Sequence, residues 1–303
     1  MMHLHILGCH SATPKAKLHP TAQVLDFNGE LCLIDCGEGT QVRLRQQKIK
    51  FTRIKHIFIS HLHGDHCYGL IGLISTFGLL KREADLHIYG PKGIKKFINI
   101  QLELSKTYIS YQIIFHELTS TKAEIILEHN KFTVETIPLD HRIYTNGFLF
   151  RGKPRDRKLL INQVEEFGID VAYYKSIKKG KDIKLDDGTL VKNEALTEEP
   201  KPPNSYAYCS DTVFKPSLAR QLHQVEVLYH ESTFLEKDED LCFKTKHSTA
   251  KQAAIIAQKA QVKHLILGHF SARYRDENAY KVEAETIFES TYLAKSGQCF
   301  SFE

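Results

Sequence analysis

The segment HIFISHLHGDH at residues 56–66 constrains this chain more than any other feature. An apolar, strand-like run ends at Ser60, and the next six residues contain four candidate metal ligands, His61, His63, Asp65 and His66. A loop that directly follows a buried strand holds its side chains rigidly, and imidazole and carboxylate groups without cysteine favour zinc, with manganese or iron as alternatives. The segment therefore predicts a metal site at the end of a strand.

The spacing within this segment predicts two ions. His61 and His63 alternate with Leu62 and can point the same way, toward one ion. Asp65 and His66 belong to the following turn and can hold a second ion a few ångströms away. Two ions about 3.5–4 Å apart share one bridging hydroxide and clamp a phosphate or a carbonyl. A polar loop without metal is the alternative interpretation.

Four ligands do not complete two sites, and three further candidates each follow an apolar run. They are His141 after FTVETIPL, Asp211 after SYAYCS and His269 after KHLILG. At each position the ordinary alternative is a core residue with a satisfied hydrogen bond. Their shared place just past a strand favours metal ligation, with Asp211 able to bridge both ions. Asp35, which ends the run LCLID, is predicted to accept a hydrogen bond from a ligand histidine.

The order of the expected elements predicts an α/β layered fold with mixed sheets. Hairpin-like strands come first and strand–helix alternations follow, which argues against a purely parallel sheet. The expected strands are 3–7, 23–27, 31–35, 56–60, 86–89, 112–116, 132–138, 206–210, 225–230, 264–268 and 298–302. The expected helices are 68–80, 91–105, 159–168, 214–224, 248–260 and 277–290.

Composition narrows the class of protein. Hydrophobic residues make up 42% and charged residues 25% of 303 residues, which is typical of a globular chain and excludes general disorder. No apolar run approaches the ~18 residues of a membrane helix, and the start lacks the basic segment of a signal peptide. Seven scattered cysteines do not form a disulfide framework. We therefore expect a cytoplasmic protein without a membrane partner.

One stretch concentrates positive charge. Arg151 to Lys184 carries ten basic and five acidic residues, so its net charge equals the +5 of the whole chain. We interpret residues 150–200 as an arm inserted into the main domain. Concentrated lysine and arginine are the electrostatic footprint of phosphate binding. The alternative interpretation of this stretch is a charged, solvent-exposed surface segment.

Taken together, these motifs resemble those of the metallo-β-lactamase superfamily, and within it those of the ribonuclease Z family of tRNA 3′-processing endonucleases. The resemblance covers nearly the whole chain. It rests on HLHGDH and on four later segments: YGPKGIKKFI at 89–98, VLYHESTF at 227–234, KHSTAKQAA at 246–254 and GHFSARY at 268–274. It implies an αββα sandwich, two mixed sheets flanked by helices, as a single metallo-β-lactamase domain over 1–303 with a tRNA-binding arm inserted at 150–200.

The resemblance also implies roles for the candidate ligands. His61, His63 and His141 would hold one Zn²⁺, and Asp65, His66 and His269 the other, with Asp211 bridging; Mn²⁺ or Fe²⁺ are alternatives. A hydroxide shared by the two ions would attack the scissile phosphorus, and Asp65 would accept its proton.

A second pair resembles the residues with which the family protonates the leaving 3′ oxygen. These are Glu231, which ends an apolar strand, and His247, which precedes a helix that Ser248 would cap. From the residues alone, a purely structural hydrogen bond between strand and helix is the alternative.

The implied activity is removal of the 3′ trailer from precursor tRNA, leaving a 3′-hydroxyl on the tRNA and a 5′-phosphate on the trailer. The arm would grip the tRNA, with Lys175, Lys178 and Lys179 as its basic contacts, and Arg273 would contact a substrate phosphate. The family resemblance further implies a homodimer in which the arm of one subunit clamps the tRNA that the other cleaves.

Two other functions compete with this interpretation. The first is another hydrolase of the superfamily that acts on a small phosphodiester, a sulfate ester or a thioester. Such a substrate does not require a cationic extension of ~30 residues, so the arm argues against it. The second is a non-catalytic RNA-binding scaffold, against which the full set of seven ligands argues.

Overall fold

The computed structural model describes residues 2–302 and divides them into two compact units. The first unit comprises the chain up to Arg151 and from Asn204 onward, and the second comprises Gly152–Pro203. Each unit has its own hydrophobic core.

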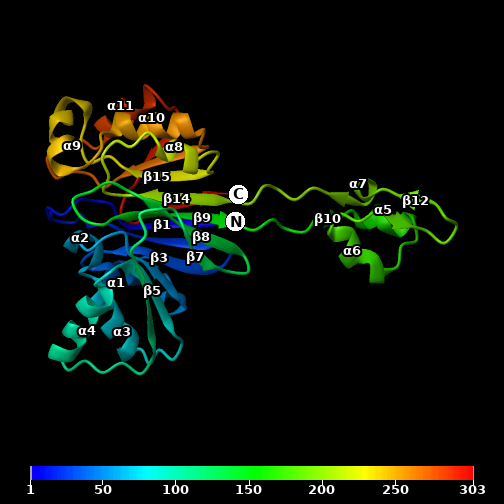
Figure 1. Ribbon diagram of the computed structural model, residues 1–303, viewed down its shortest axis with the longest axis horizontal. Coiled ribbons are helices and arrows are strands. Elements are labelled where there is room, and N and C mark those ends of the chain that lie inside the picture. The colour runs from blue at the N-terminus through cyan, green and yellow to red at the C-terminus, as the bar shows by residue number, and fades with distance from the viewer. Residues whose placement is uncertain (1, 303) are drawn as a thin grey trace. The chain divides into compact units, whose positions relative to one another are not determined.

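Two seven-stranded sheets form the centre of the first unit (Figure 1). The first sheet contains β1 (Met2–Gly8), β2 (Ala22–Phe27), β3 (Glu30–Cys36), β4 (His56–Phe58), β5 (Leu86–Pro91), β6 (Ile113–Leu118) and β18 (Cys299–Phe302). The second sheet contains β7 (Ile125–Glu128), β8 (Phe132–Pro138), β9 (Asn146–Gly152), β14 (Ser205–Cys209), β15 (Val227–Glu231), β16 (His264–Gly268) and β17 (Thr291–Leu293).

Both sheets are mixed. The first has the order β18–β1–β2–β3–β4–β5–β6, antiparallel as far as β3 and parallel from β3 to β6. The second has the order β17–β16–β15–β14–β9–β8–β7, with β14 to β17 parallel and β9 antiparallel to β14. The prediction of a sandwich of two mixed sheets is confirmed.

Strict alternation of side chains along the strands builds this sandwich. In β3, Ile34 joins the core that includes the facing side chains of the two sheets, and Leu33 joins the core under the outer helices. Phe58 of β4 packs against Phe148 and Phe150 of β9, with ring centroids 5.4 and 5.3 Å away. Aromatic contacts of this kind therefore hold the sheets face to face.

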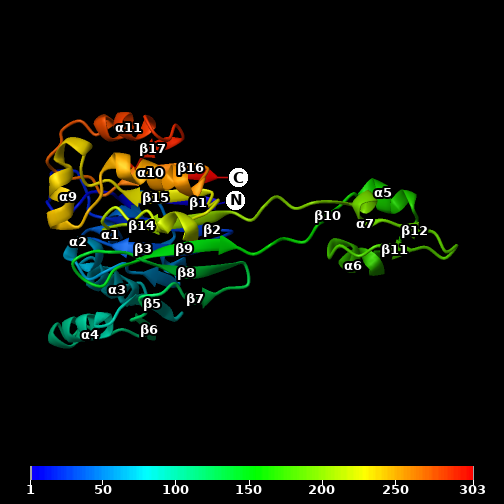
Figure 2. The same ribbon diagram turned by 45° about the horizontal axis from the view of Figure 1, so that its top comes forward.

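Helices cover the outer face of each sheet (Figures 1 and 2). The first sheet carries α1 (Thr40–Gln46), α3 (Leu70–Leu79) and α4 (Ile94–Leu104). The second carries α8 (Leu218–Gln221), α10 (Ala250–Ala260) and α11 (Asn278–Glu285). Two further helices, α2 (Gly64–Cys67) and α9 (Glu239–Thr245), lie in connections that reach the site described below.

Every strand and helix expected from the sequence has a counterpart, but several elements were missed. Among them are α1, α9, β7, β9 and β17. The helix α1 buries only Thr40 and Leu44, so it has no apolar periodicity to detect. The helix expected over 214–224 is shorter, Leu218–Gln221, because Pro216 restricts the backbone before it.

The second unit is a small fold with its own core (green in Figure 2). Two short antiparallel pairs, β10 (Lys158–Leu159) with β13 (Thr197–Glu198) and β11 (Ile183–Lys184) with β12 (Leu190–Val191), are accompanied by α5 (Ile161–Glu166), α6 (Tyr174–Lys178) and α7 (Asn193–Leu196). Its core consists of Leu159, Val164, Ile169, Ile177, Ile183, Val191 and Leu196. The arm expected at 150–200 begins two residues before this unit and ends three residues before the unit's last residue, Pro203.

None of the helices in the described chain has the length and apolar character that a bilayer crossing requires. All seven cysteines are unpaired thiols.

A row of histidines crosses the first sheet, on β4, β5 and β6. His56 and His87 are register partners, and His87 Nδ1 lies 3.1 Å from Nε2 of His116. The Nδ1 atom of His56 is buried and has no hydrogen-bond partner within residues 2–302. Burial, together with the neighbouring His87 and His129, lowers the pKa of His56 to about 4.

Protonation of His56 should therefore destabilise the fold at acid pH. An unfolded histidine binds a proton near pH 6.5 and folded His56 only near pH 4, so the stability it contributes above pH 6.5 is lost as the pH falls through this window. His56→Phe, which can pack on Phe58 and Tyr89, should show a shallower fall of the urea midpoint between pH 6.5 and 4 than the unmodified chain. The exposed His223→Gln variant is the control, and equal slopes for His56→Phe and the unmodified chain would contradict the assignment.

Candidate metal centre

The seven candidate ligands lie together at the ends of strands in the first unit. His61 and His63 follow β4, and Asp65 and His66 belong to α2, the next turn of the chain. His141 follows β8, Asp211 follows β14 and His269 follows β16. Residues far apart in the sequence therefore meet at one edge of the sandwich, because these strands all end there.

One group consists of His61, His63, His141 and Asp211, whose ligand atoms all lie within 4.8 Å of one another. His63 Nδ1 is 3.0 Å from His61 Nε2 and 3.3 Å from His141 Nε2. Oδ2 of Asp211 lies 3.5 Å from His61 Nε2 and 3.7 Å from His141 Nε2.

The other group consists of Asp65, His66 and His269. The Nε2 atoms of His66 and His269 are 3.4 Å apart, and Oδ2 of Asp65 lies 3.4 Å from each of them. All three side chains are buried.

Asp211 faces both groups with different oxygens. Oδ2 faces the first group, whereas Oδ1 lies 3.3 Å from His66 Nε2 and 3.2 Å from His269 Nε2. Burial alone would raise the pKa of this carboxyl group, but His269, His66 and His61 hold it well below its ordinary value. The geometry makes Asp211 able to bridge two cations.

The distances within each group match a tetrahedral metal site. Ligand atoms about 2.0–2.1 Å from a zinc ion in tetrahedral geometry lie about 3.3 Å from one another. The nitrogen and oxygen atoms described above are separated by 3.0 to 3.7 Å and converge from four strands. The donor set, imidazole and carboxylate without thiolate, suits zinc, manganese or iron.

The other ring nitrogen of four of these histidines has a hydrogen-bond partner, which for His61 is the hydroxyl of Ser60, 3.0 Å from Nδ1. Nδ1 of His66 donates to Oδ2 of Asp35 at 2.7 Å, and Nδ1 of His141 donates to the carbonyl of Lys246 at 2.8 Å. Nδ1 of His269 lies 2.9 Å from Oγ1 of Thr233. Such outer partners leave Nε2 free to bind a metal and orient the ring.

Asp35 accepts four hydrogen bonds from residues around the site. Besides His66, it accepts from the N–H of Ser60 at 2.7 Å, the hydroxyl of Ser60 at 2.9 Å and the hydroxyl of Tyr208 at 2.6 Å. The predicted contact between Asp35 and a candidate ligand histidine is thereby confirmed. Asp35, Asp211 and His269 all have left-handed backbone angles, with φ of 54°, 60° and 59°, which aim these side chains off the strand ends.

Glu231 and His247 form a buried ion pair beside the two groups. His247 Nδ1 lies 2.9 Å from Oε1 of Glu231, which also accepts from the N–H of Thr212 at 2.7 Å. Burial alone would lower the pKa of His247, but the Glu231 carboxylate raises it to about 9. Burial alone would raise the pKa of Glu231, yet its bond with His247 keeps it below its ordinary value.

The expected cap of the helix after His247 is wrong by one residue. Thr249, not Ser248, caps α10 through a capping box with Gln252. The N–H of Ser248 donates instead to Oε2 of Glu231 at 3.1 Å. The segment before the helix therefore donates a hydrogen bond to Glu231, because the oxygens of a fully buried carboxylate need hydrogen-bond donors.

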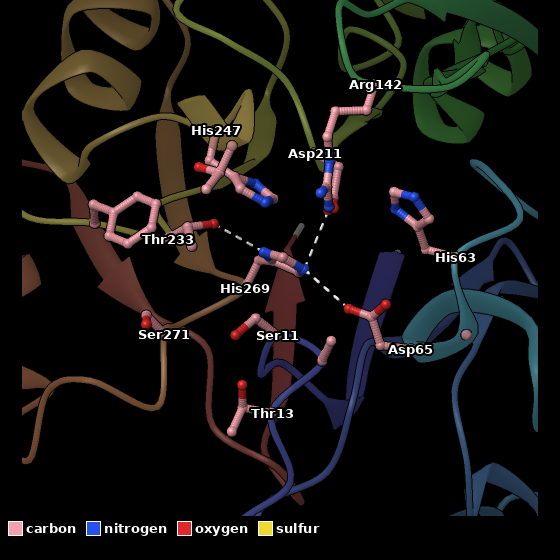
Figure 3. A pocket seen from close by; sticks show the side chains of 14 residues that line it. Ser11, Thr13, His63, Asp65, Arg142, Asp211, Thr233, His247, His269 and Ser271 are labelled. Atoms are coloured by element: carbon pink, nitrogen blue, oxygen red, sulfur yellow. Dashed lines mark hydrogen bonds and ion pairs between the residues drawn. The ribbon is translucent and has the colours of Figure 1, made fainter. Parts of the chain in front are cut away.

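A pocket of about 390 Å³ opens over these residues (Figure 3). Asp65, His63, His247 and His269 line it, and Arg142 extends its guanidinium from the rim. Within residues 2–302, no carboxylate forms an ion pair with Arg142, so the guanidinium can bind an incoming anion. Arg273, the arginine expected near substrate, is exposed and is not among the residues that line this pocket.

Sequence reasoning missed three residues of the site. Arg142 could have been found because it directly follows a candidate ligand, His141. Thr233 lies two residues after Glu231 and bonds both Glu231 and His269. Tyr208 reaches Asp35 from the facing sheet, a contact that no local pattern signals.

The fold and the clustered ligands define the class of this protein. Two mixed sheets with helices outside and a histidine–aspartate centre at the strand ends are the metallo-β-lactamase fold. A metallo-β-lactamase fold protein from Bacillus subtilis, YhfI, superposes with a TM-score of 0.69 at 18% identity over 99% of this chain and 98% of that one. A family model described as "Anti-Pycsar protein Apyc1" matches residues 2–161.

Relatives over the full length show the particular family. Ribonuclease Z of Bacteroides fragilis is 46% identical over 298 residues, 98% of each chain, and that of Porphyromonas gingivalis 45% over 291 residues, 96% of each. The crystal structure of the human tRNase Z short form has a TM-score of 0.73 at 27% identity, covering 99% of this chain and 98% of that one. The chain belongs to the ribonuclease Z family.

Replacing Asp35 should weaken metal binding. Asp35→Asn keeps the shape but turns an amide toward the Nδ1–H of His66, so we expect zinc affinity to fall about 10- to 100-fold. Tyr208→Phe, which removes one of the four hydrogen bonds, should have a smaller effect in the same direction. Chelator competition followed by zinc analysis measures both.

The matched control is Asp26→Asn, which changes a carboxylate away from the centre, where it accepts from the N–H of Gly29. Thermal unfolding would show whether each variant is folded. Unchanged zinc affinity in a folded Asp35→Asn chain would contradict the role given to Asp35.

Proposed function

We propose that this chain is a zinc-dependent endoribonuclease that removes the 3′ trailer from tRNA precursors. The products would be a 3′-hydroxyl on the tRNA and a 5′-phosphate on the trailer. The observation that carries the proposal is the Asp211 carboxylate shared between two ligand groups, in a chain that belongs to the ribonuclease Z family. The name of the human structural neighbour, tRNase Z, supports tRNA as the substrate.

Two Zn²⁺ ions per chain fit the donor set. His61, His63 and His141 would hold one, and Asp65, His66 and His269 the other, with Asp211 between them. When bound, the ions supply Lewis acidity that polarises the scissile phosphate and makes hydroxide available near neutral pH.

Asp65 would accept the proton of the attacking water. Its carboxylate lines the pocket. Burial alone would raise its pKa, but His66 and His269 hold the pKa below its ordinary value, so the group is ionised at neutral pH. An ionised carboxylate at this position can hold and orient the nucleophile.

His247 would donate a proton to the leaving 3′ oxygen. Its pKa of about 9 keeps it protonated at neutral pH, and Glu231 occupies Nδ1, which leaves Nε2 for the substrate. Glu231 thereby orients the ring and stabilises the charged form. Such a pair is the arrangement that general acid catalysis requires.

Cationic side chains would hold the RNA. Arg142, which lines the pocket, would bind the scissile phosphate or its neighbour. Arg273 would contact a more distant phosphate. Lys175, Lys178 and Lys179 are exposed at α6 in the second unit and would contact the tRNA backbone. We further propose that the enzyme works as a homodimer in the cytoplasm; sedimentation velocity would test the dimer.

Cleavage of a transcribed precursor tests the proposal. Zinc-loaded chain is incubated with a pre-tRNA carrying a 3′ trailer, and both product ends are mapped. We expect a single cut at the end of the tRNA, with a 3′-hydroxyl and a trailer 5′-phosphate. Asp65→Ala should bind the RNA but lose cleavage. Rapid hydrolysis of a small phosphodiester without cleavage of the precursor would instead identify a hydrolase of small esters.

The effect of removing the expected general acid, His247, should depend on the leaving group of the substrate. His247→Gln should lower kcat on pre-tRNA by about 10²- to 10⁴-fold, because the 3′ oxygen of ribose needs a proton. Bis(p-nitrophenyl) phosphate releases a stable phenolate and should lose far less. Equal losses on both substrates would show that His247 has a structural role only.

Removing charge from α6 should affect only the large substrate. The triple variant Lys175→Ala, Lys178→Ala and Lys179→Ala should lower kcat/KM on pre-tRNA and reduce the slope of log affinity against log salt by ~0.7–0.9 per lost phosphate contact. Hydrolysis of the small phosphodiester should not change.

The control for α6 is a triple alanine variant of three exposed lysines of the first unit, Lys50, Lys55 and Lys122. It removes the same charge from the chain elsewhere. Identical salt slopes for the two triple variants would mean that α6 makes no specific contact.

A further inference from the structure

A second pocket adjoins the candidate metal centre and shares a wall with it. Its volume is about 620 Å³, within the ~300–1,000 Å³ of small-molecule sites. His247 lines both pockets. The other walls come from the segment after β14, through Val213 and Phe214, and from α9, through Cys242 and Phe243.

Phe243 is an unusual wall residue. Its side chain is 88% exposed, although Cys242 beside it in α9 is buried. The ring therefore contributes little to the core, and its face is open to a ligand. A flat aromatic surface at the rim of an apolar pocket is the kind of platform on which nucleobases stack.

The charges in the wall of the pocket, Asp140 and Glu239 against Lys246 and His247, nearly balance, which suits an uncharged nucleobase. Lys244 and Lys246 follow Phe243 within three residues of the chain. The two carboxylates in the wall already have partners: Asp140 accepts from Lys246 Nζ at 2.7 Å, and Glu239 accepts from the amide of Gln252 at 2.7 Å. Lys246 therefore offsets the charge of Asp140, whereas Glu239 keeps its negative charge, because a neutral amide donor does not compensate it.

Hydrogen bonds connect the wall of this pocket to the candidate metal centre. The carbonyl of Lys246, at the end of α9, accepts the hydrogen bond from Nδ1 of His141 at 2.8 Å. One residue later, His247 is fixed by Glu231. A group seated against α9 is thus held at a defined position relative to the reacting phosphate.

We propose that this pocket binds the base of the unpaired nucleotide whose 3′ oxygen is released, with Phe243 as its stacking platform. The inference rests on the proposed function, in which His247 stands at the leaving oxygen. That oxygen, its ribose and its base belong to one nucleotide, so the base must lie within reach of His247. The second pocket lies next to His247, and its apolar walls can receive this base. Phe243 would then be a specificity-determining residue for the last nucleotide of the tRNA.

The test combines a protein variant with an abasic substrate. Phe243→Ala should lower kcat/KM on pre-tRNA about 5- to 150-fold, the range that one stacked base provides, and leave hydrolysis of bis(p-nitrophenyl) phosphate unchanged. A pre-tRNA abasic at the last tRNA nucleotide should lose as much with the unmodified chain. The variant and the abasic substrate together should lose no more than either alone.

Three controls make the test specific. Phe243→Tyr should retain the activity, whereas Phe243→Leu, which keeps apolar bulk without an aromatic face, should lose most of it. Tyr108→Ala removes an aromatic side chain of similar exposure, 89%, far along the chain from the pocket, and should have no effect. A pre-tRNA abasic at the first trailer nucleotide should be impaired equally in Phe243→Ala and the unmodified chain.

Several results would overturn the proposal. The first is that the two losses in kcat/KM multiply when Phe243→Ala is assayed on the pre-tRNA that is abasic at the last tRNA nucleotide. This result would place the base elsewhere. Coupling of Phe243 to the first trailer nucleotide would reverse the assigned orientation. Failure of the unmodified chain to cleave any precursor would instead refute the proposed function, and this result is distinct because it precedes any effect of Phe243.

Discussion

The Asp35 carboxylate is the interaction on which the candidate centre depends. It lies at the end of β3 in the first sheet, and Tyr208 donates to it from β14 of the second sheet. Ser60 and His66 donate to the same group. A fully buried carboxylate is stable only when its oxygens are satisfied, so this one draws both sheets and the metal loop to a common point.

A second set of hydrogen bonds joins the expected proton donor to the metal centre. Thr233 donates to Glu231 and lies next to His269, so one hydroxyl touches both the acid pair and a candidate ligand. The carbonyl of Lys246 orients His141, one residue before His247. Shared hydrogen bonds therefore link the candidate ligands to the Glu231–His247 pair, an arrangement that would suit a reaction with nucleophile and leaving group in line. The same short segment also forms the wall of the pocket that contains Phe243.

Much of the fold could be predicted from local patterns. Strands such as β3 and β8 carry regular alternation or continuous apolar runs, and each expected strand has a counterpart in the structure. The missed helices α1 and α9 bury few side chains, so no periodic face marks them. The strand β9 was missed although Asn146-Gly147, a dipeptide that often marks a turn, opens its short apolar run. Pairing between strands of distant sequence lay beyond any local pattern.

The sequence by itself determined which residue types stand at the strand ends, because HLHGDH and the lone His141, Asp211 and His269 each follow an apolar run and can be recognised there as candidate ligands. Only the tertiary structure decided that the two oxygens of Asp211 face different groups and that Arg142, not Arg273, lines the pocket. The physical reason is that the sequence indicates which residues stand at strand ends but not how far apart their side chains lie. Distances between side chains more than a hundred residues apart arise from how two sheets pack, and that packing is a property of the whole core.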